Sequence, residues 1–308
     1  MPAHASTGAV VSSPFSENSA IRDFLRAPHW SKHGDAFQHG QSLGRSGALE
    51  VRLARGPLDL WRAQRLRYKV FYEEQAARPD LRSLILRRDA DRFDPVCDHL
   101  LVVDHEAVGP FGQKRPRIIG TYRLLRQDVA DRHGGFYTQG EFNIAPLLQA
   151  HQGLRFLELG RSCVLLPYRN KKTVELLWHG IWAYLRRHNI DVMLGCASFE
   201  GTDPLRHALA LSFLHHHARS PEIWRASAHH GACRDMWLMP VEMVDAKLAM
   251  RALPPLIKAY LKVGAKFGDG AVVDRQFGTT DVLVVLPVAE IAARYVEYYG
   301  PEGQRYAA

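Results

Sequence analysis

Residues 158–177, ELGRSCVLLPYRNKKTVELL, contain an apolar run, a basic turn and the start of a helix. The apolar run is interrupted only by Glu158 and Arg161, and its composition predicts a strand that is largely buried. Thr173 is a residue type that caps helices, and an apolar helical pattern follows it. The stretch therefore predicts a buried strand that leads through a charged turn, without glycine, into a helix.

The residues on either side of this stretch continue the alternation of strands and helices. Periods of two and of about 3.6 predict the following elements: strand 48–54, helix 57–75, strands 99–104, 117–125 and 155–166, helix 174–189, strand 191–199, helices 204–217 and 253–263, and strands 270–274 and 281–287. Three successive strands exclude a purely alternating βαβ series. We therefore expect an α/β fold in which helices cover a mixed sheet.

The chain has 308 residues, of which 46% are hydrophobic, so it is long enough to bury a sizeable core. Residues 1–47 are rich in Ser, Ala, Gly and His and show no periodicity, which predicts a mobile N-terminal tail. We expect residues 48–308 to form a single domain. Within it, about residues 201–253 form a helical insertion before the last two strands.

The net charge is +8, which favours an acidic partner. No stretch approaches the ~20 continuous apolar residues of a membrane span, and the N-terminus lacks the pattern of a signal peptide. The cysteines are scattered without a C-x-x-C pair, which argues against a disulfide scaffold. They are Cys97, Cys163, Cys196 and Cys233. A cytoplasmic protein, soluble or peripheral on a membrane, is the prediction.

Several strings resemble the GNAT acyltransferase superfamily and, within it, the ornithine N-acyltransferases of ornithine-lipid synthesis. The resemblance covers roughly residues 48–290. The strings are RYKVFYEE (67–74), DADRFDPVCDHLLVVD (89–104), IIGTYRLL (118–125), EFNIAPLL (141–148), ELGRSCVLLPYRN (158–170) and PPLIKAYLKVGAKFGDGAVVDRQFGTTDV (254–282).

This resemblance implies a GNAT-like fold and the transfer of a fatty acyl group, 3-hydroxylated, from acyl carrier protein to the α-amine of L-ornithine. The product would be a lyso-ornithine lipid. The phosphopantetheine arm of the carrier would bring the acyl group, with no other cofactor.

A weaker resemblance, to acyl-homoserine-lactone synthases, covers residues 65–165. It rests on Arg67, Phe71, Asp91, Asp94, Arg123, Glu158 and Arg161. It implies the same kind of donor and a different acceptor, so a signal synthase is one alternative. A basic binding module for nucleic acid or membrane is another. The Asp-rich loop and the apolar strands favour a cavity instead, and we expect no nucleic-acid partner.

An ornithine acceptor carries a side-chain ammonium and a carboxylate besides the reacting amine. Carboxylates must meet the ammonium, and arginine suits the carboxylate through paired hydrogen bonds. Asp91 and Asp94, with Arg67, Arg123 or Arg161, supply that complement. The alternative is structural, because Asp94 precedes a proline and Asp residues often serve turns.

Glu158 and Arg161 lie three apart on a strand, which would place them on opposite faces. A bulge at Gly160 would add one residue and return both to one face. The resemblance implies that backbone N–H groups of Gly160, Arg161 and Ser162 then stabilise the oxyanion. The alternative is a buried Glu158–Arg161 ion pair that only fixes the strand.

The attacking amine must be neutral, whereas a free α-amino group is mostly protonated at pH 7. A carboxylate can take the proton, and Glu158 and Glu141 are the candidates. Glu141 also fits a helix-start residue. No Ser-His-Asp or Cys-His order is present, and Cys163 is more simply a core residue. The histidines at 215–217, 229 and 230, with Cys233, lack helical ligand spacing, so we expect no metal site.

The donor turn reads Arg169, Asn170, Lys171, Lys172, Thr173. The superfamily holds the pyrophosphate of coenzyme A in a glycine-containing turn at this place, and the glycines are absent here. A helix N-terminus with three basic residues suits the single phosphate of a phosphopantetheine arm, and the carrier behind it is acidic. A solvated basic turn is the alternative.

A second basic feature is the series Lys258, Lys262 and Lys266, which step by four residues. If these lysines share a helix face, they would meet the carrier protein or an anionic inner-membrane surface. Gly264 interrupts the series, which favours an ordinary solvated face.

Overall fold

A computed structural model describes residues 41–75 and 77–291 of the chain. The strands are β1 (Ser42–Ser46), β2 (Leu49–Leu53), β3 (Asp98–Asp104), β4 (Arg117–Arg126), β5 (Phe142–Asn143), β6 (Phe156–Val164), β7 (Val192–Glu200), β8 (Ser227–Ala228), β9 (Cys233–Arg234), β10 (Lys266–Asp274) and β11 (Thr279–Pro287). The α-helices are α2 (Pro57–Tyr68), α3 (Leu81–Leu86), α4 (Gln127–Ala130), α5 (Ala145–Ala150), α6 (Lys171–Arg187), α7 (Ala208–His217), α8 (Ala246–Ala252) and α9 (Pro255–Val263).

Short helical turns connect several of these elements. A π-helix, η1 (Lys69–Glu74), continues α2. The 3₁₀ turns are η2 (Tyr137–Gly140), η3 (Leu166–Tyr168), η4 (Pro204–His207), η5 (Glu222–Trp224), η6 (Val241–Met243) and η7 (Val288–Glu290).

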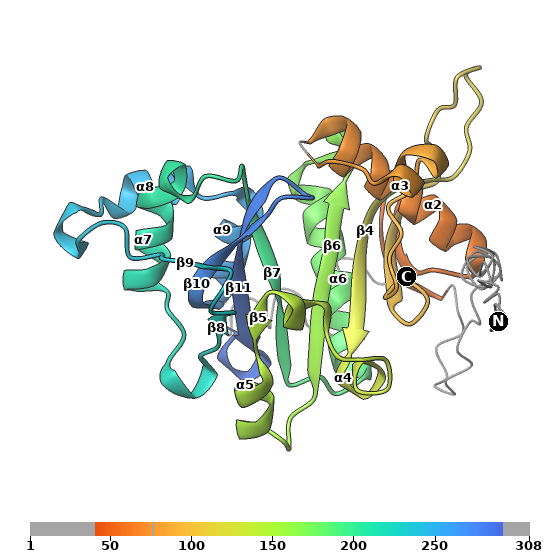
Figure 1. The fold of residues 1–308 in the computed structure, drawn as a ribbon. Helices are drawn as coiled ribbons and strands as arrows, with labels where there is room; N and C mark the ends of the chain where they lie inside the picture. Colours follow the sequence, from red (N-terminus) through yellow and green to blue (C-terminus); the bar gives the residue numbers. More distant parts are fainter. Residues whose placement is uncertain (1–40, 76, 292–308) are drawn as a thin grey trace, which may run out of the picture.

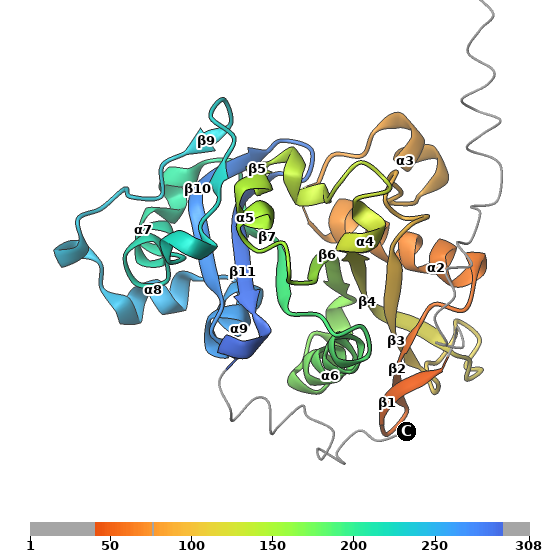
Figure 2. The ribbon, with the colours of Figure 1, turned by 90° about the horizontal axis from the view of Figure 1, so that it is seen from below.

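One sheet runs through the described residues in the order β1-β2-β3-β4-β6-β7-β11-β10-β8-β5, with β9 beside β10 (Figure 1). Its pairs are antiparallel except β6 with β7 and β10 with β8. Helices α6 and α9 lie on one face, and α2 and α4 lie on the other (Figure 2). The predicted mixed sheet covered by helices is confirmed.

Helix α6 packs very closely on the sheet. A Cβ added at Gly180 would lie 2.6 Å from the Val51 side chain and 3.1 Å from that of Leu100. Ile181 and Tyr184, which follow on the same helix, are completely buried. The missing side chain at Gly180 therefore lets the helix axis approach β2 and β3, and the apolar residues around it form the centre of the core.

Strands β6 and β7 pair only at their beginnings. The register joins Phe156–Glu158 to Val192–Leu194, and no further pair follows between these two strands in the described residues. At the last point of contact, a Cβ on Gly195 would lie 2.4 Å from the Leu159 carbonyl oxygen. Gly195 thus permits the close crossing after which the two strands separate.

Strand β6 carries a bulge where it runs beside β4. Gly160 lies opposite Arg123 and Cys163 lies opposite Thr121, so Arg161 and Ser162 together face one residue, Tyr122. The predicted bulge is present. Its left-handed residue, however, is Arg161 with φ 50°, one position beyond the glycine. Gly160, Arg161 and Ser162, which were expected to act together, therefore lie at the bulge. The backbone strain there falls on Arg161.

The structure differs from the sequence pattern at several boundaries. Strand β1 begins at Ser42, ahead of residue 48, because an edge strand that is half-exposed has no apolar alternation to reveal it. The cap of α6 is Asn170, which accepts a hydrogen bond from the Thr173 N–H at 3.1 Å; Thr173 itself lies inside the helix. The mostly helical insertion also supplies β8 and β9, which extend the sheet. The expected tail up to residue 40 lies outside the described residues.

The lysine series 258, 262 and 266 is broken by the end of α9. Gly264 follows the helix with φ 106°, and Lys266 already belongs to β10. The three lysines therefore do not form one helical stripe. No helix among the described residues has both the length and the apolar character needed to cross a membrane.

Candidate active site

A buried ionic network joins α2 to the loop before β3. Arg67 is completely buried, and its guanidinium donates two parallel hydrogen bonds to Asp94, at 2.8 and 2.7 Å. The same guanidinium lies 2.7 Å from the Asp89 carboxylate. Burial favours the protonated form of Asp94, but the charges of Arg67 and Arg123 hold its pKa far below the ordinary value. Arg67 thus turns inward to the acidic loop and fixes it.

Two further arginines complete the network from the sheet. Arg123 on β4 donates to both oxygens of Asp91 at 2.7 Å, and Arg161 in the β6 bulge lies 3.1 Å from the same carboxylate. Three arginines therefore balance the three aspartates at positions 89, 91 and 94. Asp91 and Asp94 were expected to meet the acceptor ammonium; in the structure both carboxylates are engaged by arginines, partners that the sequence could not assign.

Arg161 is also held by aromatic rings. Its guanidinium lies 4.7 Å from the centre of the Tyr137 ring and 4.6 Å from that of Phe277. Phe277 belongs to the turn between β10 and β11, so this contact connects the bulge to the C-terminal hairpin. These two ring contacts help to hold the guanidinium in place.

Glu158 does not pair with Arg161. Its carboxylate accepts hydrogen bonds from the Tyr137 N–H at 3.0 Å, and from the Thr138 N–H and hydroxyl at 2.7 and 2.5 Å. The side chain is buried at the start of the 3₁₀ turn η2. Glu158 was expected to act as the base or to form an ion pair with Arg161. In the structure its carboxylate anchors η2, and Glu141 is the residue that follows that turn.

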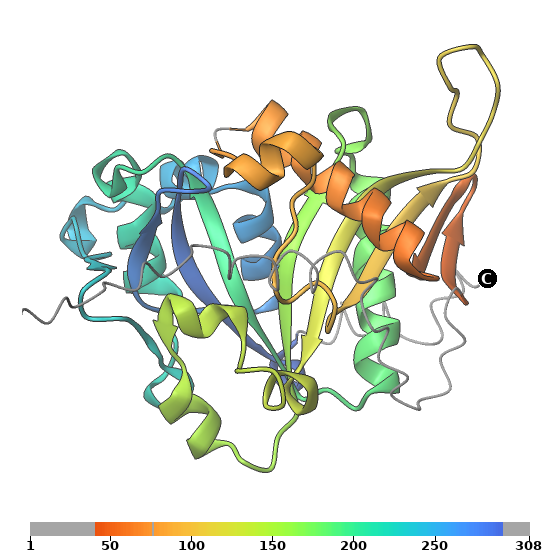
Figure 3. The same ribbon diagram turned by 45° about the vertical axis from the view of Figure 1, so that its right-hand side comes forward.

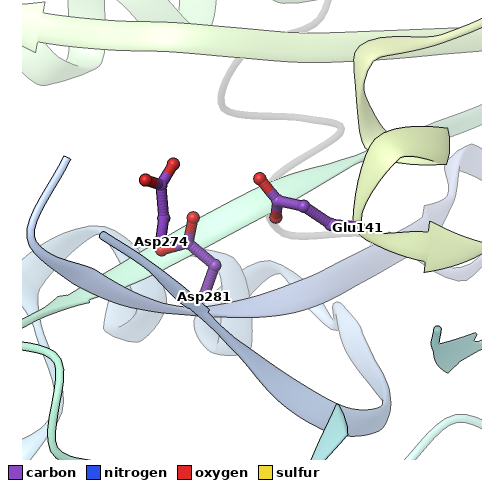
Figure 4. Close-up of side chains that lie close together, drawn as sticks. All are labelled: Glu141, Asp274 and Asp281. Carbon is purple, nitrogen blue, oxygen red and sulfur yellow. The ribbon is translucent and has the colours of Figure 1, made fainter. Parts of the chain in front are cut away.

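Glu141 converges with two aspartates of the last hairpin, Asp274 and Asp281 (Figure 4). One oxygen from each of the three lies within 4.8 Å of the others. Asp281 is opposite Val272 in the β10–β11 register, and Asp274 is two residues further along β10. The two aspartates are therefore diagonal neighbours on one face of the hairpin. We call these three residues the carboxylate cluster.

The surroundings hold the cluster in place and leave part of it without partners. Asp274 Oδ1 accepts the N–H groups of Gln276 at 2.7 Å and Phe277 at 2.9 Å, which fixes its orientation. Glu141 Oε2 and Asp281 Oδ1 are buried and have no hydrogen-bond partner among the described residues. No Lys, Arg or His within residues 41–75 and 77–291 forms an ion pair with any member of the cluster.

This environment changes the acidity of the cluster. Burial and the nearby charges of Asp281 and Asp274 raise the pKa of Glu141 to about 8. Burial likewise raises the pKa of Asp281 to about 6. A carboxyl group of this kind exchanges its proton near neutral pH, which is what a general base for an amine requires.

The sequence reasoning included Glu141 and missed Asp274 and Asp281. The signal that could have found them is an Asp at the head of the apolar strand 281–287, facing another Asp across a short turn. The cluster is the one group within the described ranges that has metal-ligand spacing. The histidines at 215–217, 229 and 230 do not belong to this cluster. Three oxygen donors suit a cation of either kind, a hard metal ion or an ammonium.

The expected donor turn lies where β6 ends and α6 begins, at the top of the view in Figure 3. Arg169 donates to the Val164 carbonyl at 2.9 Å and to Glu74 at 2.5 Å, so it braces the turn. Lys171 and Lys172 are exposed in the first turn of α6. The positive end of this 17-residue helix thus faces solvent with two lysines beside it.

Two cysteines lie near these features. Cys163 belongs to β6 and Cys196 to β7, and the Cys196 thiol is 3.7 Å from the Thr138 hydroxyl. Burial raises the pKa of both thiols well above the ordinary value, so they stay protonated at neutral pH. Neither is activated as a nucleophile, which agrees with direct transfer to the acceptor.

Comparison with known proteins identifies close relatives over most of the chain. The model of the acetyltransferase (GNAT) domain matches residues 66–179. An L-ornithine N(alpha)-acyltransferase of Rhizobium meliloti (strain 1021) is 54% identical over 86% of this chain and 88% of its own length. The protein of the same name from Agrobacterium fabrum is 52% identical over 89% and 93%.

More distant similarities are also found. An L-ornithine N(alpha)-acyltransferase of Rhodobacter capsulatus is 40% identical over 82% of this chain and 95% of its own length. Among solved structures, an N-acyl amino acid synthase from uncultured soil microbes covers 79% of this chain and 92% of its own, with a TM-score of 0.45 and 11% identity.

Proposed function

The chain belongs to the L-ornithine N(alpha)-acyltransferase family of GNAT acyltransferases, and from this premise we propose that it acylates the α-amine of L-ornithine. The observation that carries the proposal is identity above 50% to two relatives of that name over most of both chains. We further propose that the donor is a 3-hydroxylated fatty acyl group on acyl carrier protein and that the product is a lyso-ornithine lipid. The phosphopantetheine arm of the carrier then serves in place of a separate cofactor.

In the proposed reaction, the neutral α-amine nitrogen attacks the thioester carbonyl carbon. A C–N bond forms, the tetrahedral intermediate collapses, and the C–S bond breaks to release the phosphopantetheine arm as a thiolate, which takes up a proton from solvent. The proton lost from the amine goes to Glu141. Its pKa of about 8 supports this role, because a base works best when its pKa lies near the working pH.

Glu158 is the less suitable base of the two candidates. Its carboxylate accepts three hydrogen bonds from Tyr137 and Thr138, and protonation would disturb them. Its proposed role is to position η2 and thereby Glu141. The bulge at Arg161 and Ser162 interrupts the regular ladder with β4, and we assign oxyanion stabilisation to the backbone N–H groups of Gly160, Arg161 and Ser162.

The donor side of the proposal rests on the start of α6. Exposed Lys171 and Lys172 at a helix N-terminus support binding of one phosphate and of an acidic carrier surface. We assign the acceptor carboxylate to Arg161, which would bind it in addition to Asp89 and Asp91 and which also contacts the rings of Tyr137 and Phe277. A cytoplasmic location with contact to the inner membrane stays a prediction.

The test is to incubate the purified protein with acyl carrier protein thioesters and a panel of amines, and to identify the products by mass spectrometry. We expect N-acylornithine from the carrier thioester and little product from acyl-CoA. Formation of an acyl-homoserine lactone from S-adenosylmethionine would favour the signal-synthase alternative. No acylation of any amine would contradict the proposal.

A further inference from the structure

Within the described residues, no member of the carboxylate cluster forms an ion pair with a basic side chain. Arg161 is the nearby positive group, and it is already engaged by Asp89 at 3.4 Å and Asp91 at 3.1 Å. The network of three arginines and three aspartates is neutral by itself. Glu141, Asp274 and Asp281 therefore add carboxylates in excess, at a place where two of their oxygens are buried and unpaired.

The cluster is built by segments that are far apart in the sequence and are both held rigidly. Glu141 follows η2, which Glu158 anchors, and its backbone carbonyl accepts the His229 N–H at 3.0 Å. Asp281 is 5% exposed on β11, which pairs with β7 along its whole length. The side chains point into one shared space (Figure 4). The backbone positions of both segments are therefore fixed by hydrogen bonds to neighbouring elements.

Burying unpaired carboxylates costs free energy, and a cation in the shared space would remove that cost. The proposed acceptor brings such a cation. L-Ornithine has a distal ammonium that takes no part in the chemistry and stays charged throughout. Two aspartates suit this permanent charge, whereas the neighbouring glutamate can face the amine that must lose its proton.

We propose that Asp274 and Asp281 determine acceptor specificity by binding the distal ammonium of a diamino acid, while Glu141 faces the amine that is acylated. This inference rests on the proposed function, because it takes acylation of an amino-acid amine as given. An acceptor with a neutral side chain would leave the buried Asp281 Oδ1 unpaired and both aspartates without a counter-charge. Sites built for a polar group reject analogues that lack it for this reason.

The test compares L-ornithine with L-norvaline, which has the same carbon skeleton without the distal amine. Steady-state kcat/KM is measured for both acceptors in the wild type and in the isosteric variants Asp274→Asn and Asp281→Asn. Each variant should lower the ratio of kcat/KM for ornithine to kcat/KM for norvaline about 10–100-fold, which corresponds to one charge-assisted hydrogen bond.

The matched control is Asp269→Asn. Asp269 also lies on β10, but it pairs with Arg219 at 2.7 Å and lies outside the cluster. This variant should keep the wild-type preference for ornithine over norvaline. A selective loss in the two cluster variants, with the control unaffected, supports the assignment.

Other outcomes overturn the inference and leave the proposed function intact. Equal losses for ornithine and norvaline would make the aspartates structural, while the wild type still acylates ornithine. If the Asn variants fail to fold, the rise in melting temperature of the wild type is measured with each acceptor. An equal rise with ornithine and norvaline overturns the inference. Loss of ornithine preference after EDTA treatment, restored by Mg²⁺ or Ca²⁺, would assign the cluster to a metal ion. Failure of the wild type to acylate ornithine would instead remove the proposed function.

Discussion

Glu158 Oε1 accepts hydrogen bonds from both the backbone N–H and the hydroxyl of Thr138, at 2.7 and 2.5 Å. Thr138 lies within η2, and Glu141 follows this turn directly. The buried carboxylate of Glu158 thus positions Glu141, whose raised pKa suits a general base. The two glutamates that the sequence offered as rivals are parts of one arrangement.

Glu158→Gln should destabilise the protein and lower turnover without changing the pH at which activity rises. The amide places an NH₂ donor against the N–H groups of η2, and an unmet buried hydrogen bond costs about 1–3 kcal/mol. Thermal unfolding and a pH–rate profile on the same variant check this. A normal melting temperature together with abolished activity would point to Glu158 as the base itself.

Glu141→Gln should lower turnover at pH 7 by about 10²–10⁴-fold, because the amide cannot accept the amine proton. In the wild type, kcat/KM should rise with pH through about 8 as Glu141 loses its own proton. The deficit of the variant should grow as the pH rises through about 8, because only the wild type gains a deprotonated base, whereas the amine becomes neutral equally for both proteins. A constant deficit across the pH range would exclude proton transfer to Glu141.

The acceptor-free protein should lose stability as the pH rises. The folded-state pKa values of Glu141, about 8, and Asp281, about 6, exceed the ordinary 4.5 and 3.8. The folded protein therefore holds these protons more tightly than the unfolded chain. This stabilisation is complete below about pH 4 and is lost as the pH rises through 6 and then 8.

Melting temperatures measured between pH 4 and 9 test this dependence. The decline should be smaller in Glu141→Gln, which carries no titrating carboxyl at that position. Glu242→Gln, an exposed acid on η6, is the control and should follow the wild type. An identical decline in all three proteins would mean that other groups cause it.

Arg67→Ala should destabilise the protein by about 3–5 kcal/mol, because it leaves buried carboxylates without a counter-charge. Arg67 is the partner of both Asp89 and Asp94. The control is Arg62→Ala on the same helix: Arg62 is half-exposed and lies 3.9 Å from Asp59. Chemical denaturation of both variants measures the difference. Equal stabilities would show that the network contributes little to folding.

Reversing the charge of Lys171 and Lys172 together should weaken binding of the acyl carrier protein, most strongly at low ionic strength. The double change Lys247→Glu with Arg251→Glu on α8 alters the net charge equally at a different surface and is the matched control. The Michaelis constant for the carrier thioester at two salt concentrations measures the effect. Equal effects of both pairs would indicate only a general charge attraction.

The sequence predicts the fold well because its strands and helices carry strong local patterns. The apolar run 155–166 and the helix after it appear where their periods place them. Strand β1 has no such pattern, because it lies at the edge of the sheet and its residues are half-exposed. The bulge at Arg161 was foreseeable from the spacing of Glu158 and Arg161, but its left-handed residue was not.

The candidate site is only partly predictable, because partners depend on the tertiary fold. The sequence supplies arginines and aspartates in number, yet only the structure shows that Arg67 and Arg123 engage Asp94 and Asp91. Asp281 could be recognised as a charge in an apolar strand, but its meeting with Glu141 requires the sheet order. Long-range pairing of this kind leaves no periodic trace in the sequence.

The carboxylate cluster brings together residues from two distant segments of the chain. The segment 66–179 contains Glu141, the bulge and the start of α6, whereas Asp274 and Asp281 lie on a hairpin about a hundred residues later. The proposed acyl-transfer residues and the proposed ammonium-binding aspartates thus lie on separate segments of the chain. If the proposed role of the aspartates holds, exchanging the hairpin 266–287, with Phe277 and the apolar residues that pack against β7 retained, should change which amine is accepted while Glu141 and the bulge stay in place.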